Sequence, residues 1–209
     1  MAPLKPSTRL KRADPVLADL IARIPENVLD RTEVERPDDH YGALLRSITG
    51  QQLSVKAAYA IYQRVLAYFD GEIPTPEQIL AADPIELKES GGLSHAKTKY
   101  LRSLAEHVVS GELELHKLND LPDDEVIAEL VAVKGLGVWT AQMFLMFHLG
   151  REDVMPTGDL GIRRAVMIEY GLDSLPGHDE LIELSESWRP YRTLACLYLW
   201  ASVDASPEA

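Results

Sequence analysis

The sequence predicts an all-α protein of about ten short helices, and three observations support this fold class. Nearly every segment carries the apolar residues of an amphipathic helix. Many segments begin at an Asp, Ser or Thr that can cap a helix, and several end at a glycine. No run of alternating apolar and polar residues lies between hairpin turns, so no β-strand is expected.

The first three expected helices lie between residues 14 and 69. Asp14 can cap the first, with Pro15 at its first helical position, where a missing N–H is tolerated. The segment 41–69 is long enough for two helices, and residues 50–54, GQQLS, are the expected break between them. The chain ends, residues 1–14 and 204–209, are expected to be flexible.

Capping signals define the next three helices. Two of them begin with residue pairs at the spacing of a capping box, Thr75 with Gln78 and Asp83 with Glu86. A longer helix is expected from Ser94 to a terminal glycine at 111. The remaining helices are expected over residues 123–133, 138–150, 158–171, 179–187 and 191–202.

The net charge of −12 counts against a nucleic-acid ligand, because proteins that bind phosphates usually present a basic surface. The charges are unevenly distributed, however. Residues 13–40 carry three Lys or Arg against eight Asp or Glu, and residues 111–130 carry one against seven. Residues 41–70 carry three against one, and residues 88–102 four against one. These last two segments could therefore still face a polyanion.

Composition excludes several other classes of protein. No stretch approaches the ~20 apolar residues of a membrane-spanning helix, and the N-terminus lacks the apolar core of a secretory signal. The single cysteine, Cys196, cannot form an internal disulfide. It also excludes a multi-cysteine zinc site and a cysteine-ligated iron–sulfur cluster. A cytoplasmic protein, associated with the nucleoid if bacterial, is expected.

Residues 131–141 contain a lysine and two glycines, KGLG, followed at once by VWTA. Glycines at 135 and 137 permit positive φ and let a ligand approach the backbone closely. The helix that follows presents unpaired N–H groups and the positive end of its dipole, and Lys134 adds a cation. The pattern predicts a binding site for one phosphate. A plain helix–helix turn with a C-cap glycine is the alternative.

Asp159 is the strongest candidate for a functional carboxylate. Pro156 and Gly158 stop a helix from reaching it, so it is expected at the N-terminus of the next helix. The helix dipole favours an ionised carboxylate at that position. A capping role alone is the alternative, and it is the more common use of such an aspartate.

The hairpin KGLGVWTA followed by PTGD resembles the helix–hairpin–helix DNA glycosylases. Three further stretches, SITGQQLSVKAA, GGLSHAKTKYLRSLA and WRPYRTLACLYLW, are similar to the 3-methyladenine DNA glycosylase II branch, which excises alkylated bases. The resemblance covers residues 15–203. It implies two helical lobes with a DNA-binding cleft between them, one of residues 15–39 with 151–203 and the other of residues 40–150. The longer bacterial members carry an extra N-terminal β-domain, and this chain is expected to be a minimal form without it.

The resemblance implies how the bond to the base is broken. Asp159 is expected to stabilise the oxocarbenium-like transition state and to position the attacking water. The target base is expected to flip out of the duplex and to stack against Trp139, Met143 and Trp200. Trp139 and Met143 lie one helical turn apart and share a face. Core packing is the alternative role of all three side chains.

Two further features follow from the resemblance. Trp139 stands where strand-cleaving relatives carry a lysine nucleophile, so a monofunctional enzyme that uses water, with no lyase step, is expected. No catalytic cofactor and no iron–sulfur cluster are expected. The hairpin of the family often holds a monovalent cation, Na⁺ or K⁺, which here would be bound by the backbone carbonyls of Val131, Val133 and Leu136.

The segment GQQLS corresponds to the place where a wedge residue of the family enters the duplex. Gln52 or Leu53 is the expected wedge, with Gln51 in support; a polar turn between helices is the alternative. Lys97 and Lys99 are candidate phosphate contacts, or members of a solvated helix face.

Four functions therefore compete. One is a helical interaction protein, which the acidic net charge favours and the four motif matches do not; the other three involve DNA. The first is an alkylpurine DNA glycosylase that acts as a monomer on double-stranded DNA containing a damaged base, without any membrane partner. The second is a monofunctional glycosylase for another lesion, because pocket shape decides the substrate. The third is a non-catalytic helix–hairpin–helix DNA-binding module, which would need neither Asp159 nor Trp139.

Overall fold

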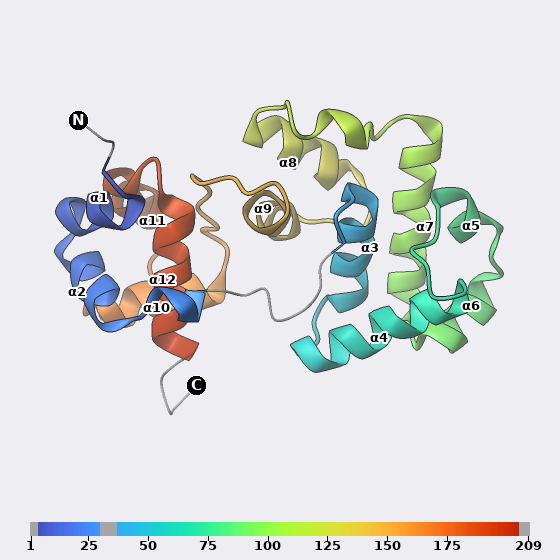
Figure 1. The fold of residues 1–209 in the computed structure, drawn as a ribbon, viewed down its shortest axis with the longest axis horizontal. Coiled ribbons are helices and arrows are strands. Elements are labelled where there is room, and N and C mark those ends of the chain that lie inside the picture. Colours follow the sequence, from blue (N-terminus) through green and yellow to red (C-terminus); the bar gives the residue numbers. More distant parts are fainter. Residues whose placement is uncertain (1–3, 30–36, 205–209) are drawn as a thin grey trace. The chain divides into compact units, whose positions relative to one another are not determined.

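The computed structural model describes residues 4–29 and 37–204, and Figure 1 shows its arrangement. The described residues form α-helices, short 3₁₀ helices and turns, with no β-strand among them, so the all-α prediction is confirmed. The chain divides into two compact units. Unit 1 consists of residues 1–33 and 150–209, and unit 2 of residues 34–149. These boundaries differ by a few residues from those expected.

Unit 2 is built around two central helices, α3 and α7. Helix α3 packs against α4, α7 and α9, and α7 also packs against α5 and α6. Apolar side chains at helical spacing fill the space between them: Leu44, Leu45 and Ile48 of α3 and Leu101 and Leu104 of α7 are fully buried or nearly so. The elements are α3 (His40–Gly50), α4 (Val55–Tyr68), α5 (Pro76–Ala81), α6 (Pro84–Gly91), α7 (His95–Ser110), 3₁₀ helix η2 (Leu115–Lys117), α8 (Asp123–Ala132) and α9 (Val138–Phe147).

Unit 1 joins the two ends of the described chain. Helix α12 contacts α1, α2, α10 and η1, and Trp188 is completely buried. The elements are α1 (Pro6–Ala13), α2 (Pro15–Arg23), η1 (Glu26–Leu29), α10 (Leu160–Glu169), α11 (His178–Ser185), η3 (Glu186–Trp188) and α12 (Arg192–Asp204).

Local capping occurs where the sequence predicts it, but the predicted Asp83–Glu86 box is only half formed: Asp83 accepts from the N–H groups of Ile85 and Glu86, without the reciprocal side-chain bond of a complete box. The Asp14 carboxylate accepts hydrogen bonds from the first turn of α2, and Thr75 with Gln78 forms a complete capping box. Ser94 caps α7, and Gly111 ends it in the left-handed conformation with φ +77°. Helix α3 ends at residue 50 and α4 begins at residue 55, so the predicted break is confirmed.

The prediction of a flexible N-terminus over residues 1–14 is wrong for its described part. Residues 6–13 form α1, which packs against α2 and α12. Leu10 drives this packing, since only 1% of its surface is exposed. At the other end α12 continues to Asp204, and residues 205–209 of the expected flexible tail lie outside the described residues.

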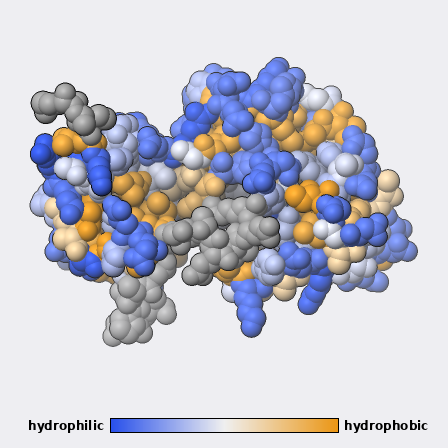
Figure 2. Space-filling model, viewed as in Figure 1, coloured by the Kyte–Doolittle hydropathy of each residue, from blue (hydrophilic) through white to orange (hydrophobic). Residues whose placement is uncertain are grey.

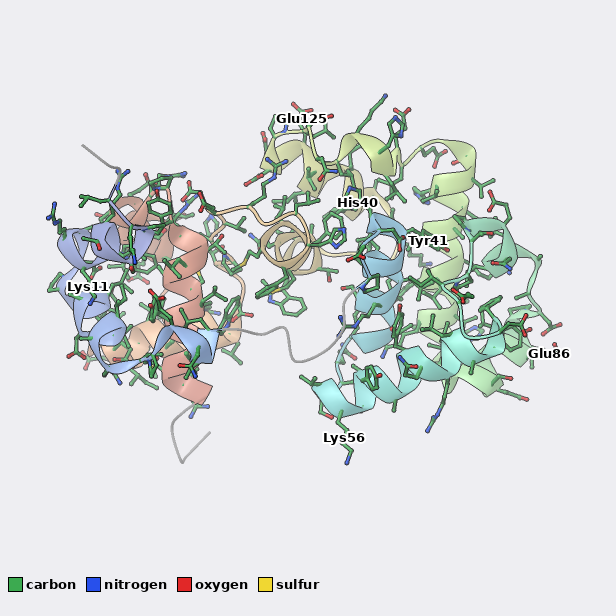
Figure 3. The ribbon with its side chains drawn as sticks, viewed as in Figure 1. Lys11, His40, Tyr41, Lys56, Glu86 and Glu125 are labelled. Atoms are coloured by element: carbon green, nitrogen blue, oxygen red, sulfur yellow. The ribbon has the colours of Figure 1, made fainter. Side chains whose placement is uncertain are left out.

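The acidic segment 111–130 contributes its charge to the start of α8. Asp123, Asp124 and Glu125 form the first turn of this helix, where the helix dipole stabilises carboxylates. Figure 2 shows a hydrophilic surface at this edge of unit 2, and Figure 3 labels Glu125 there. The ten-residue helix places these carboxylates about 15 Å from the turn that follows its other end. These three carboxylates and the KGLG turn therefore lie at opposite ends of α8.

No helix of the described residues combines the length and the hydrophobicity that crossing a membrane requires.

Candidate active site

The hairpin between α8 and α9 requires glycine at position 135. Gly135 has φ +98°, a conformation that side chains strongly disfavour. A Cβ atom at this position would also lie 2.2 Å from Cγ of Tyr100, well inside van der Waals contact. The first glycine of the motif is therefore explained by backbone conformation and by packing together.

Gly137 has a different role from the one that the sequence suggested. Its φ is −102°, so only Gly135 uses the positive φ that both glycines permit. Gly137 is the N-cap of α9, and nothing lies within 4 Å of the place where its Cβ would be. The glycine leaves open space beside the first backbone N–H groups of α9, as a phosphate site there would need.

The turn over residues 50–54, here called the wedge turn, is connected to the hairpin. The side-chain amide of Gln51 donates a 2.7 Å hydrogen bond from Nε2 to the carbonyl oxygen of Gly135. Gln52 and Leu53 are exposed, as a wedge requires. The Lys97 ammonium donates a 2.8 Å bond to the carbonyl oxygen of Thr49, a contact between residues 48 positions apart that no local pattern predicts.

A pocket of about 370 Å³ opens between α3, α9 and the wedge turn. This volume is within the range of about 300–1,000 Å³ typical of small-molecule sites. Aromatic and sulfur-containing side chains from α9 form one wall, among them Trp139, Met143 and Phe147. Gln51, Gln52 and Leu53 also line the pocket, so five of the predicted site residues meet there. Among the described residues that line the pocket, Arg46 is the only Lys, Arg, Asp or Glu.

Behind this pocket lies a pair of histidines that sequence analysis missed. His148 lines the pocket, and its Nε2 lies 2.7 Å from Nδ1 of His40, in the first turn of α3 (Figure 3). Asn119 Nδ2 lies 3.1 Å from the other ring nitrogen of His40. Burial lowers the pKa of His40, which favours neutral imidazole in this wall. The two histidines are 108 positions apart, so no local spacing signals their contact.

In unit 1, Asp159 occupies the N-cap of α10, as predicted. Its Oδ1 accepts a 2.8 Å hydrogen bond from the backbone N–H of Ile162 and a 2.9 Å bond from the indole Nε1 of Trp200. Asp159 is 9% exposed and Trp200 is 7% exposed. A Cβ on Gly161 would lie 3.1 Å from both partners, so the glycine leaves room for the pair. The carboxylate is thus held in one orientation by the first turn of α10 and by the indole of Trp200, which is 41 positions away in the sequence.

The described residues contain no group of three or more His, Cys, Asp or Glu side chains that could bind a metal ion. A cation at the hairpin would instead use backbone oxygens. Val131 lies in the last turn of α8, whose carbonyls have no further helical partner, and the negative end of the helix dipole favours a cation there. The carbonyl of Val133 already accepts the N–H of Leu136 at 3.0 Å, which leaves its second lone pair available.

Two relatives found by comparison with known proteins share the name DNA-3-methyladenine glycosylase. DNA-3-methyladenine glycosylase 1 of Schizosaccharomyces pombe is 38% identical over 162 residues, which is 77% of this chain and 71% of that protein. The protein YfjP of Bacillus subtilis is 32% identical over 170 residues, and the match spans 59% of its length. The chain therefore spans about three fifths of the length of YfjP and about seven tenths of the length of the Schizosaccharomyces pombe enzyme.

Solved structures show the same fold. A 3-methyladenine DNA glycosylase of Schizosaccharomyces pombe in complex with abasic DNA has a TM-score of 0.80 at 32% identity, with coverage of 97% of this chain and 98% of that one. A DNA-3-methyladenine glycosidase of Bacillus halodurans has a TM-score of 0.74 at 37% identity, with coverage of 92% and 90%.

The family described as the HhH-GPD superfamily of base excision DNA repair proteins matches residues 45–190. The match covers more than half of the chain and includes both the hairpin and Asp159. We conclude that this protein belongs to the HhH-GPD superfamily of base excision DNA repair proteins.

Proposed function

We propose that this protein is a monofunctional DNA glycosylase that hydrolyses the N-glycosidic bond of alkylated purines of the 3-methyladenine type in double-stranded DNA. The observation that carries the proposal is the buried, doubly hydrogen-bonded carboxylate of Asp159 at the N-terminus of α10. It belongs to a chain whose relatives are named DNA-3-methyladenine glycosylases.

The chemistry needs one anion and one water molecule. The bond between the sugar C1′ and the base nitrogen breaks, and its electron pair leaves with the base, which neutralises a base made cationic by alkylation. Positive charge develops on the sugar and is stabilised by the Asp159 carboxylate. Water then adds at C1′ and gives its proton to the carboxylate or to solvent. Because the leaving base is already cationic, a second acidic residue is not required.

The base-binding wall is proposed to be the α9 face that carries Trp139 and Met143, in the pocket beside the wedge turn. Aromatic faces attract a flipped, electron-poor base by stacking and by cation–π interaction. Tryptophan at position 139 also supplies no amine, so no Schiff base can form there. Chromatography of the bases released from methylated duplex DNA tests this activity, and a panel of deaminated and oxidised lesions tests the rival substrate classes.

For Trp200 the structure suggests a positioning role in addition to any contact with the base. Trp200→Phe keeps a flat aromatic face but removes the N–H that bonds Asp159. Since a hydrogen bond to a charged group contributes roughly 1.5–3 kcal/mol, the single-turnover rate of base release should fall by about tenfold or more, with little change in DNA affinity. A higher KM with an unchanged single-turnover rate of base release would instead assign Trp200 to base stacking alone.

The hairpin is proposed to bind one DNA phosphate through the first N–H groups of α9. Gly137→Val fits the backbone, because φ is −102° and the Cβ position is open, so the fold should be kept, with a loss of about 1 kcal/mol because Val is a poor N-cap. The side chain should block close approach of the phosphate and weaken binding by about tenfold, as expected for one lost charge-assisted hydrogen bond. Fluorescence anisotropy with duplex DNA measures this effect, and Gly137→Ala should give a smaller loss. Equal affinity in all three proteins would exclude the hairpin as the phosphate site.

The same hairpin is proposed to hold a monovalent cation through the carbonyls of Val131, Val133 and Leu136. Such an ion would separate the phosphate from the carbonyl end of α8 and would take no part in bond cleavage.

A further inference from the structure

One stripe of helix α7 contacts the hairpin on which phosphate binding is proposed. Tyr100 and Ser103 lie three residues apart on the same face of this helix. The Tyr100 ring fills the space that a side chain at Gly135 would need. The Ser103 hydroxyl accepts a 3.2 Å hydrogen bond from the backbone N–H of Lys134. Two successive residues of the hairpin are therefore fixed against α7.

The same stripe, one turn earlier, contacts the end of α3 immediately before the wedge turn. Lys97 precedes Tyr100 by three residues, and its Nζ lies 2.8 Å from the carbonyl oxygen of Thr49, in the last turn of α3. This ammonium is partly buried, and burial lowers the pKa of Lys97. The side chain is thus directed into the protein, whereas Lys99 on the same helix is exposed.

Gln51 joins the wedge turn to the hairpin directly, through its 2.7 Å bond to the Gly135 carbonyl. The contacts that Lys97, Tyr100, Ser103 and Gln51 make with these two segments are here called the frame. The residue that follows Gln51 is conformationally strained. Gln52 has φ +58°, a left-handed conformation that costs a non-glycine residue free energy and persists only where the surroundings impose it. The bonds of Lys97 and Gln51 fix the chain immediately before this residue.

We propose that Lys97 and Gln51 are positioning residues that set the distance between the wedge turn and the hairpin. The frame would let one rigid unit hold a phosphate at one turn while Gln52 and Leu53 enter the duplex at the other. The inference rests on the proposed base-flipping function. It also reassigns Lys97, which the sequence suggested as a phosphate contact, to a bond within the protein.

The test compares Lys97→Met, which removes the ammonium at similar size, with Lys97→Arg, which keeps a cationic donor. Lys99→Met is the matched control, since it removes one positive charge from the same helix without touching the frame. Two substrates are used: a duplex with one 7-methylguanine paired with cytosine, and the same strand with 7-methylguanine opposite an abasic site. The second substrate needs little help from a wedge, because the lesion is already unpaired.

If Lys97 positions the turn, Lys97→Met should slow base release from the paired duplex by about tenfold, the effect of one lost charged hydrogen bond. Release from the unpaired lesion should fall less than about threefold, because unpairing no longer limits the reaction. Lys97→Arg should recover most of the rate of base release from the paired duplex. Lys99→Met should change the rates on the paired and the unpaired substrate by the same factor. Equal loss on the two substrates in Lys97→Met would overturn the proposal.

The salt dependence of DNA binding separates this role from a phosphate contact. A lost phosphate contact lowers the slope of log affinity against log salt by about 0.9. A positioning residue leaves that slope unchanged, so a reduced slope in Lys97→Met would overturn the proposal.

Hydrogen exchange tests the frame without any enzyme activity. Amide protons of residues 50–54 and 133–137 should exchange faster in Lys97→Met and Gln51→Met than in Lys99→Met. Unchanged exchange would reject the frame. If the wild-type protein released no base while the exchange result held, the glycosylase proposal would fail and the frame would stand.

Discussion

Asp159→Asn should reduce base release from methylated duplex DNA by about a hundredfold to a thousandfold, the usual cost of removing one preorganised electrostatic group from a transition state. The asparagine side-chain oxygen can still accept the bonds that Ile162 N–H and Trp200 Nε1 donate to Oδ1. The fold of α10 should therefore remain, and only the negative charge is lost.

The measurement is the single-turnover rate of base release, with DNA affinity determined separately by anisotropy. Affinity should stay within about twofold of the wild type, because the carboxylate stabilises charge that develops only in the transition state. Asp173→Asn is the matched control, since it neutralises an exposed carboxylate of the same unit. If Asp159→Asn retained the wild-type rate, the proposed catalytic role of Asp159 would be excluded.

The second large effect concerns stability. Asp14 is 6% exposed and has all of its acceptor capacity in use. Its Oδ1 accepts from Val16 N at 2.8 Å and Leu17 N at 3.1 Å, and its Oδ2 accepts from the Tyr170 hydroxyl at 2.6 Å and from Trp188 Nε1 at 2.9 Å. Asp14→Ala leaves these donors unsatisfied in the interior. The free energy of unfolding should fall by about 3–5 kcal/mol, as for other broken buried charge networks.

Asp83→Ala provides a control at a second Asp-Pro pair that caps a helix. Asp83 also precedes a proline at the start of a helix, and it caps α6 through Ile85 N and Glu86 N, but these bonds are exposed. Its removal should cost about 1 kcal/mol, the usual value for an N-cap. Urea unfolding followed by circular dichroism measures both variants. Similar losses in the two would show that the contacts of Asp14 with Tyr170 and Trp188 contribute nothing beyond capping.

These two aspartates show the limit of what a sequence pattern contains. Both Asp-Pro pairs predict a helix start correctly, because a cap depends on atoms two or three residues away. The Trp188 partner of Asp14 is 174 positions distant, and no local pattern encodes it. The prediction of a flexible N-terminus was wrong for the same reason, since α1 is ordered where Leu10 is buried, and this helix packs against α12 at the other end of the chain.

The sequence by itself determined the helical class, the break at residues 50–54, the hairpin and the place of Asp159 at the start of α10. Each depends on short spacings or on backbone restrictions of glycine and proline. Only the tertiary structure decided which side chains meet across the chain. The bonds of Trp200 to Asp159, Lys97 to Thr49 and Gln51 to Gly135 join residues 41, 48 and 84 positions apart. Packing of whole helices sets these distances, because a polar side chain finds its buried partner only after the apolar faces around it have come together.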